Sequence, residues 1–217
     1  MIPTPHRITA VRNMPAAVTR AGALSLLVFL AACNGTEQTS GDAVVQGTVH
    51  VCSSCHGLGG RSISPTFPRL AGQQHDYLVN QLMAFRDHTR ADPHAHTYMW
   101  GMAAKLSDAT IDGVATYYSS QPPVAGTPGD PALIAAGKKI FDDGIASRDV
   151  PACSSCHGEK AEGADQIPRL AGQHVGYLEE QLSNFSSLAR NNEIMHENSK
   201  NLTPDEIRAV AAFFGSL

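Results

Sequence analysis

Two copies of the hexapeptide Cys-Ser-Ser-Cys-His-Gly, at residues 52–57 and 153–158, hold the side chains best suited to chemistry in this 217-residue chain. Thiols spaced by two residues can both reach the two vinyl groups on one edge of a porphyrin, and the histidine that follows can bind its iron. This spacing is typical of c-type haem attachment. A zinc half-site would need two more Cys or His ligands in each copy, and a redox dithiol needs no histidine. The duplicated motif therefore predicts two covalently bound haem c groups.

Each predicted haem draws its two thioether bonds and its first iron ligand from one copy of the motif. The residues are Cys52, Cys55 and His56 in the first copy and Cys153, Cys156 and His157 in the second.

The second iron ligand is predicted from the repeat. Met99 and Met195 stand at matching positions in loops, each seven residues before the leucine that precedes the final helix of its copy. Met195 is the only methionine after the second motif, so we prefer Met99 to Met102 and Met83, which have no partner in the other copy. A thioether stabilises ferrous iron and raises the reduction potential. Two filled axial positions leave no open site for a substrate, which indicates electron transfer.

Other histidines are alternative ligands with less support. His94 and His96 have no equivalent in the second copy, so we expect them in a solvated loop. His196 is adjacent to Met195 and stays open as a competing ligand. The remaining histidines lack support from the repeat and are expected at the surface: His50, His75, His88 and His174.

A second repeated block, Pro-Arg-Leu-Ala-Gly-Gln at residues 68–73 and 168–173, follows each motif. A proline carbonyl can accept the N–H of the iron-binding imidazole and fix its orientation, so we predict this role for Pro68 and Pro168. Arg69 and Arg169 can form bidentate pairs with haem propionates. The alternative for both arginines is solvation at the surface.

The elements that must position these residues are helices. Residues 77–85 and 177–185 each carry an apolar stripe of leucine and phenylalanine at helical spacing. A final helix follows in each copy, capped by Ser107 in the first and by Thr203 in the second, where Pro204 and Glu206 add an N1 proline and a capping box. Asp130 and Pro131 open the leading helix of the second copy, and residues 42–51 form its counterpart. No strand-like alternation occurs, so the fold class is all-α.

The repeat and the turn-forming residues predict the domain limits. Residues 122–129 are rich in proline and glycine, which break helices and strands. We therefore predict an N-terminal haem domain at 42–121, a linker at 122–129 and a C-terminal haem domain at 130–217. Ahead of them lie a signal peptide at 1–32 and a linker at 33–41.

The N-terminus has the layout of a secretory signal. Three arginines and no acidic residue precede an apolar run at residues 21–32, and twelve residues are too few for the roughly 20 of a membrane-spanning helix. The run ends in Leu-Ala-Ala-Cys, which resembles the lipobox of bacterial lipoproteins. Cys33 is the one cysteine of five outside the haem motifs, and lipidation would explain it. The alternative is an ordinary signal peptide with an incidental cysteine.

The charge balance argues against nucleic acid as a partner. Without the three arginines of the signal peptide, thirteen basic residues remain against twenty acidic ones, a net charge of −7. Phosphate backbones require clusters of Lys and Arg. We instead expect redox proteins as partners, with the membrane surface reached through a lipid on Cys33.

Taken together, these residues resemble the diheme cytochrome c4 family. The likeness covers residues 42–217 and rests on the paired Cys-x-x-Cys-His motifs, the block that begins at Phe67, the Tyr-Leu-x-x-Gln-Leu helices and the Leu-Ser/Thr final helices. The resemblance implies two tandem class I cytochrome c domains related by a pseudo-twofold axis, periplasmic location, and axial methionines at the positions of Met99 and Met195. The lipid anchor and the His-Glu-Asn sequence after Met195 depart from the family pattern.

Three functions are compatible with this sequence. The first is an electron carrier of a respiratory chain that connects a quinol-oxidising complex or dehydrogenase to a terminal oxidase or reductase. The second is the cytochrome subunit of one periplasmic dehydrogenase. The third is a diheme enzyme of peroxidase type, which requires one iron with an open or displaceable ligand. The methionines in both copies favour a carrier that is not itself an enzyme.

Overall fold

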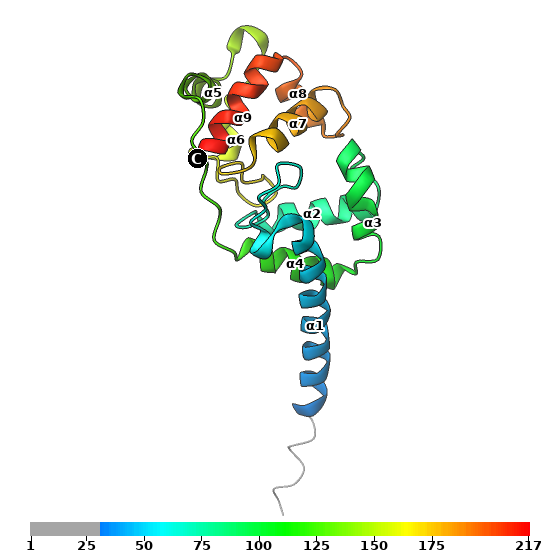
Figure 1. The fold of residues 1–217 in the computed structure, drawn as a ribbon. Helices are drawn as coiled ribbons and strands as arrows, with labels where there is room; N and C mark the ends of the chain where they lie inside the picture. Colours follow the sequence, from blue (N-terminus) through cyan, green and yellow to red (C-terminus); the bar gives the residue numbers. More distant parts are fainter. Residues whose placement is uncertain (1–30) are drawn as a thin grey trace, which may run out of the picture. The chain divides into compact units, whose positions relative to one another are not determined.

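The computed structural model describes the backbone of residues 31–217 and the side chains of residues 41–217 (Figure 1). The chain divides into Met1–Gln38 and a compact unit, Thr39–Leu217, which holds both haem motifs. Residues 1–30 of the predicted signal peptide (1–32) and the side chain of Cys33 lie outside the described residues, so lipidation of Cys33 stays a prediction.

Helices form the regular structure of both copies, here termed the first lobe (residues 41–121) and the second lobe (residues 130–217). Helix α1 enters the first lobe, which continues with α2, a π-turn, α3 and α4, and the second lobe runs from α5 to α9 (Figure 1). The bounds are α1 (Ala31–His56), η1 (Leu58–Gly60), α2 (His75–Arg86), η2 (Ala95–Met99), α3 (Trp100–Ala103), α4 (Asp108–Ser119), α5 (Pro131–Asp143), η3 (Ala146–Arg148), α6 (Ser154–His157), α7 (Val175–Ser186), α8 (Glu193–Ser199) and α9 (Pro204–Ser216).

The predicted all-α fold is confirmed. From residue 31 to the C-terminus the chain forms two isolated β-bridges and no strand. Within the same range, no helix has the length and apolarity that crossing a bilayer requires.

The predicted helix starts are present with their caps. The side chain of Thr203 accepts the Glu206 N–H at 3.3 Å, and the Glu206 carboxylate accepts the Thr203 N–H at 2.8 Å, which is a complete capping box. Ser107 caps α4 and Asp130 caps α5 in the same way, through a side-chain oxygen that accepts a main-chain N–H. Caps of this kind stabilise a helix because its first N–H groups have no partner inside the helix.

The leading and final helices of each lobe cross closely because a glycine lies at the crossing. In the second lobe, a Cβ on Gly137 of α5 would lie 2.0 Å from the Ala209 carbonyl oxygen of α9. In the first lobe the glycine belongs to the final helix, and a Cβ on Gly113 would lie 2.5 Å from Cγ2 of Val45. Buried aromatic side chains, Tyr118 and Phe214, fill the cores beside these crossings.

The two lobes differ in how the chain reaches the haem motif. In the first lobe α1 continues without a break to His56, so the whole motif is helical. In the second lobe α5 ends at Gly144, whose φ is +66°, and a loop leads to the short helix α6. A side chain at Gly144 would meet the carbonyl oxygen of Val150 at 2.3 Å, so only glycine fits this turn.

The linker at 122–129 contains no helix and passes beside the C-terminal end of α9. The Thr127 N–H donates to the Gly215 carbonyl oxygen at 2.8 Å. This contact ties the connection between the lobes to the core of the second lobe.

Candidate functional site

A single cavity of about 630 Å³ runs through both lobes and is lined by most of the predicted haem ligands. Apolar side chains at equivalent positions make up much of the wall, which suits a porphyrin face. From the predicted set the lining contains Cys52, His56, Pro68, Arg69 and Met99 in the first lobe and Cys153, Cys156, His157, Pro168, Arg169 and Met195 in the second. Cys55 lies outside this lining, with its residue exposed to solvent.

Each motif histidine is buried and held by the proline carbonyl of the same lobe. The His56 Nδ1 atom lies 2.8 Å from the Pro68 oxygen, and the His157 Nδ1 atom lies 3.1 Å from the Pro168 oxygen. A carbonyl can only accept, so Nδ1 carries the proton and the Nε2 lone pair is free to bind a metal. Burial lowers the pKa of both imidazoles, although the proline contact opposes this, so the neutral form is favoured.

The methionines of the repeat lie at the cavity, but on short helices. Met99 ends the π-turn Ala95–Met99 and Met195 lies in the first turn of α8 (Glu193–Ser199), so the expectation of loops was wrong. In the second lobe the reason is the cap, because Asn192 accepts the Met195 N–H at 2.9 Å and starts α8. Met83 and Met102 do not line the cavity, and Met102 is 46% exposed.

The alternative histidine ligands have different positions. His196 Nδ1 donates to the Phe185 carbonyl oxygen at 3.0 Å. His94 lines the cavity and its Nδ1 atom lies 2.9 Å from Glu180 Oε1 of the second lobe, so the expectation of a solvated loop was wrong for this residue. His96 is exposed, as predicted, but it lies in the π-turn Ala95–Met99 and not in a loop.

One histidine expected at the surface is instead part of the contact between the lobes. His174 is half-buried, and its Nε2 atom donates to the Ser62 carbonyl oxygen of the first lobe at 2.9 Å. The repeat places Gln74 at the equivalent position, and the Gln74 amide donates to the carbonyl oxygens of Glu162 and Gly163 in the second lobe. The prediction that His174 lies at the surface was wrong, because a contact between the two lobes depends on both copies and is not visible in one copy alone.

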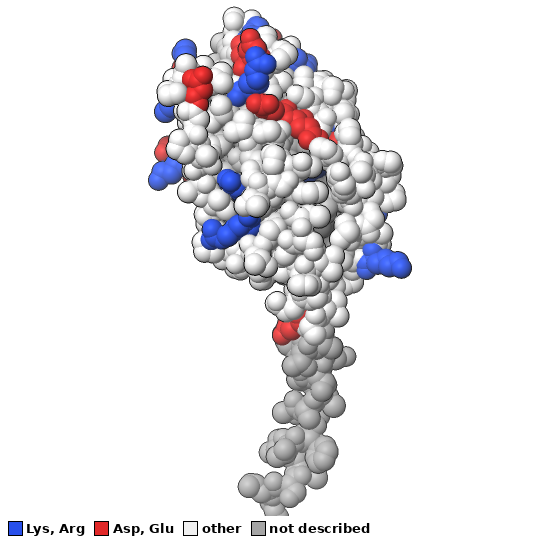
Figure 2. Space-filling model, in the orientation of Figure 1, with Lys and Arg blue, Asp and Glu red and all other residues white. Residues whose placement is uncertain are grey.

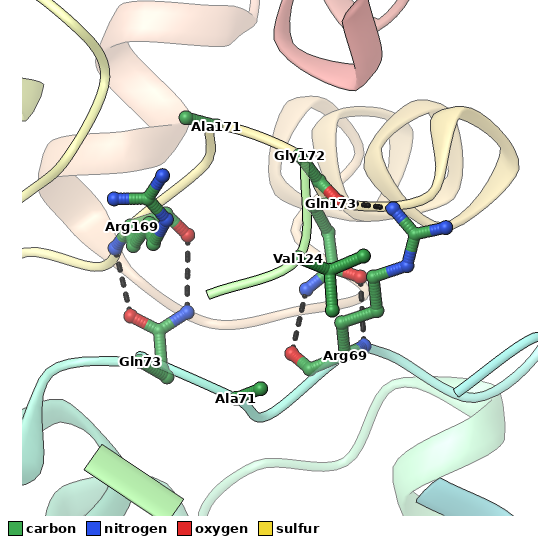
Figure 3. Close-up of a pocket in the computed structure, with 8 residues that line it drawn as sticks. All are labelled: Arg69, Ala71, Gln73, Val124, Arg169, Ala171, Gly172 and Gln173. Atoms are coloured by element: carbon green, nitrogen blue, oxygen red, sulfur yellow. Dashed lines mark hydrogen bonds between the residues drawn. The ribbon is translucent and has the colours of Figure 1, made fainter. Parts of the chain in front are cut away.

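The Pro-Arg-Leu-Ala-Gly-Gln blocks of the two lobes face each other, and their glutamines join them (Figure 3). Gln173 accepts the Arg69 N–H at 2.8 Å and donates to the Arg69 carbonyl oxygen at 2.9 Å. Gln73 makes the same pair of bonds to Arg169, at 2.7 and 3.0 Å. Sequence reasoning missed this role, although the glutamine that ends both blocks was a visible signal.

The arginines of the blocks line the cavity, and only some of the N–H groups of their guanidinium groups donate hydrogen bonds within the protein. Arg69 donates to the main-chain carbonyls of Gly172 and Ser62. Among the described residues, the buried Nε of Arg169 has no hydrogen-bond partner. A buried donor without an acceptor is costly, and a carboxylate of a bound porphyrin would satisfy it.

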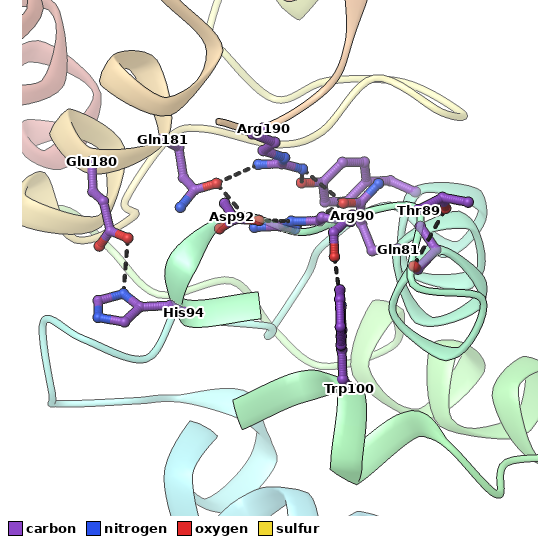
Figure 4. A network of polar contacts seen from close by, with 11 residues as sticks. Gln81, Thr89, Arg90, Asp92, His94, Trp100, Glu180, Gln181 and Arg190 are labelled. Carbon is purple, nitrogen blue, oxygen red and sulfur yellow. Dashed lines mark hydrogen bonds and ion pairs between the residues drawn. The ribbon is translucent and has the colours of Figure 1, made fainter. Parts of the chain in front are cut away.

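A second polar cluster crosses between the lobes and was also missed from the sequence (Figure 4). Arg90 donates to Gln81 and Gln181 at 2.8 and 2.9 Å, and Arg190 donates to the same two glutamines at 2.7 Å each. Arg190 also donates to the hydroxyl of Tyr77 at 3.0 Å. The signal was the recurrence of these residues 100 positions apart.

The cysteines of each motif differ in environment. The thiols of Cys52 and Cys153 are largely buried, and burial raises the pKa of Cys52 and raises that of Cys153 to about 11. Cys55 and Cys156 are exposed, and the four cysteines form no disulfide among the described residues. Each pair therefore presents one thiol inside the lobe and one at its surface.

The residues present fit two haem groups. The cavity has an apolar wall, each lobe offers a neutral imidazole with a free Nε2 and a thioether, and Arg169 has an unsatisfied donor for a carboxylate. In residues 41–217 no group of three or more His, Cys, Asp or Glu side chains is arranged to hold a metal ion.

Comparison with known proteins matches both lobes to the same protein family. The family model described as cytochrome c matches residues 41–121 and 134–217. A cytochrome c4 from Azotobacter vinelandii is 34% identical over 207 residues, which is 90% of this chain and 98% of that protein.

A solved structure and a second relative extend the comparison. The cytochrome c4 structure from Acidithiobacillus ferrooxidans has a TM-score of 0.73 and 41% identity, over 76% of this chain and 98% of that one. A protein named thiosulfate dehydrogenase electron acceptor, from Thiomonas intermedia, is 34% identical over 76% of this chain and 77% of its own length.

Proposed function

Since this chain belongs to the cytochrome c4 family of electron carriers and has two covalently bound haem c groups, we propose that each lobe binds one haem iron between a histidine and a methionine. His56 with Met99 and His157 with Met195 would bind the two irons, and Cys52, Cys55, Cys153 and Cys156 would form the thioether bonds. The observation that carries the proposal is the one cavity whose wall includes all four axial candidates.

A bound haem c supplies a one-electron couple between ferric and ferrous iron, whose potential depends on its axial ligands and surroundings. Pro68 and Pro168 hold each imidazole in one tautomer and one orientation, which leaves Nε2 free to bind a metal. The thioethers of Met99 and Met195 favour the reduced state. Arg69 and Arg169 pair with the haem propionates, because both arginines line the cavity and the buried Nε–H of Arg169 has no acceptor among the described residues.

The chain acts as a carrier and not as an enzyme, since two filled axial positions leave no place for a substrate on either iron. Its partners are redox proteins: a periplasm-facing quinol-oxidising complex or dehydrogenase as donor, and a terminal oxidase or reductase as acceptor. The protein works in the periplasm, anchored to a membrane surface by a lipid on Cys33. The lipobox-like sequence supports the anchor.

A second function is the cytochrome that accepts electrons from one dedicated dehydrogenase. It is favoured by the likeness to a protein named as the electron acceptor of a thiosulfate dehydrogenase. Stable co-purification with a single dehydrogenase separates this function from a free carrier.

The test is the weak near-infrared band that reports sulfur ligation of ferric haem, recorded for Met99→Ala and Met195→Ala. Each variant should lose about half of the band, because each removes one of two thioether ligands. Met102→Ala is the matched control, since this methionine lies three residues away in the same lobe, outside the cavity lining. An unchanged band in either cavity variant, or a loss in the control, would contradict the assignment.

A further inference from the structure

An aromatic contact runs from the motif histidine of the first lobe toward the protein surface. The imidazole ring of His56 meets the ring of Phe67 at a centroid distance of 6.2 Å, and Phe67 meets Tyr98 at 5.5 Å, both edge to face. Phe67 and Tyr98 line the cavity, and Tyr98 is also 43% exposed. Three aromatic rings in contact therefore connect the haem site of this lobe with its surface.

Two further apolar side chains are exposed on the segments that carry this contact. Met102 follows Tyr98 by four residues in the helical stretch from η2 to α3, so both side chains lie on one side of it. Met102 is 46% exposed and does not line the cavity. Ile63 belongs to the loop that carries Phe67 and is 96% exposed. We call Ile63, Phe67, Tyr98 and Met102 the apolar patch.

Both segments of the apolar patch are held in place by hydrogen bonds. At the start of the loop, the Ser62 carbonyl oxygen accepts Nε2 of His174 from the second lobe at 2.9 Å. In the helical segment, the indole N–H of Trp100 donates to the Arg90 carbonyl oxygen at 2.8 Å. A surface that is ordered before it binds loses less conformational entropy on binding. The patch is thus prepared for contact with a partner.

The segments that form the apolar patch carry no charge. Residues 62–68 and 93–104 contain no Lys, Arg, Asp or Glu. The residues of the second lobe equivalent to Phe67, Tyr98 and Met102 are aliphatic or polar: Ile167, Ile194 and Asn198. Exposed acidic residues accompany them: Asp165, Glu193 and Glu197. On the face shown in Figure 2, acidic side chains gather over the second lobe, and most of the first lobe is white. The patch therefore belongs to the first lobe alone.

We infer that the apolar patch is the surface on which a redox protein with an apolar, uncharged docking face exchanges electrons with the first haem. This inference rests on the proposed binding of that haem by His56 and Met99. One electron passes between the haem and the one-electron redox centre of the partner, and no bond forms or breaks. Contact with Tyr98 brings the partner to the aromatic rings that end at the iron ligand. This matters because electron transfer slows steeply with distance.

The chemistry of the apolar patch selects this kind of partner. Tyrosine, phenylalanine and methionine are enriched at protein–protein interfaces, and charged residues are depleted at interface cores. A partner with a strongly charged face would lose the hydration of its charges here without gaining an ion pair. Docking is therefore driven by burial of apolar surface, which salt does not screen. Contacts made by the exposed acidic side chains of the second lobe would instead weaken as salt is added.

The first experiment locates the contact by NMR on the fully reduced protein with both haems and labelled Ile and Met methyl groups. The probes are two redox-inert chromium(III) complexes of equal charge, with phenanthroline or ammonia as ligands, which broaden the signals of nearby methyl groups. The phenanthroline complex should broaden Ile63 and Met102 even at 1 M salt, where exposed charges are screened within about 3 Å. The ammonia complex should leave both signals sharp. Broadening of Ile194 by the phenanthroline complex as strong as that of Ile63 would overturn the inference.

The second experiment measures electron transfer to a gold electrode coated with a methyl-terminated alkanethiol, which imitates an apolar partner face. Met102→Lys places a charge in the apolar patch without altering the cavity lining and should lower the interfacial rate constant several-fold. Tyr98→Ala should do the same, whereas Tyr98→Phe keeps the ring and should keep most of the rate. Leu188→Lys is the matched control, because Leu188 is an exposed apolar residue of the second lobe outside the cavity lining. A rate for Met102→Lys no lower than that of the control would refute the docking role.

The near-infrared band separates this inference from the proposed ligation. Variants that keep the band and the unmodified electrode rate would show that the apolar patch is not the docking surface while the ligation stands. Absence of the band in the unmodified protein would instead refute the ligation. If Tyr98→Ala does not assemble, Met102→Lys and the NMR experiment on the unmodified protein still decide.

Two other occupants of the apolar patch are tested with the same variant. Self-association of the unmodified protein in sedimentation that Met102→Lys abolishes would assign the patch to a second copy of the chain. Adsorption to phosphatidylcholine vesicles that Met102→Lys abolishes would assign it to a lipid surface. Either result would overturn the assignment to a redox partner, and we expect neither.

Discussion

Truncation of Gln173 tests how strongly the two lobes are held together. Gln173→Ala removes two hydrogen bonds to the main chain of Arg69, at 2.8 and 2.9 Å. Each such bond contributes about 1 kcal/mol net, and a donor left without a partner costs more when it is buried. Arg69 is only half-buried, so water can partly replace the lost acceptor. The expected loss in the free energy of unfolding is about 2 kcal/mol.

Denaturant unfolding of the protein with both haems, followed by far-UV circular dichroism, measures this loss. Gln73→Ala should cost the same amount, since Gln73 makes the equivalent two bonds to Arg169. Gln121→Ala is the control, because its amide bonds only residues of its own lobe. If Gln173→Ala and Gln73→Ala were no more damaging than the control, or if they differed from each other by more than about 1 kcal/mol, the reciprocal contact would not hold the lobes as argued.

Two further predictions concern the helices that carry the site. Gly137→Ala should destabilise the protein by about 1–3 kcal/mol through overpacking against Ala209. Gly101→Ala is the control, since a Cβ added there would meet nothing within 4 Å, and it should be neutral or stabilising in thermal melts. A change of the same sign in both variants would be evidence against the packing argument. Glu206→Gln should destabilise at neutral pH, because the bond from Arg148 first, and then the cap, lower the pKa of Glu206 from its ordinary 4.5. The ionised Glu206 carboxylate stabilises the protein above the pKa of the unfolded state, and this stabilisation disappears as the pH falls through the lowered pKa of the folded state. The melting temperatures of the variant and the parent should therefore converge in acid. A difference in melting temperature that persisted there would contradict the ionic explanation.

Several features followed from the sequence because they depend on local spacing. The Cys-x-x-Cys-His motif fixes its own chemistry within five residues, and a capping box such as that of Thr203 and Glu206 needs only the turn it starts. The repeat added what one copy lacked, since it selected Met99 among three methionines of the first lobe on symmetry alone. It also indicated that Pro68 and Pro168 have one role in two places.

The tertiary structure decided which residues act between the lobes. Gln173 and Arg69 are 104 positions apart and Gln73 and Arg169 are 96 apart, so their pairing depends on how two finished helical lobes dock. Asp92 is fully buried and its Oδ2 accepts the Nε–H of Arg90 at 2.9 Å, a burial that its polar neighbours in the sequence do not indicate. Local pattern determines helices and covalent chemistry because those forces act along the chain. Burial of charge is set by the partner surface, which no single segment of the sequence contains.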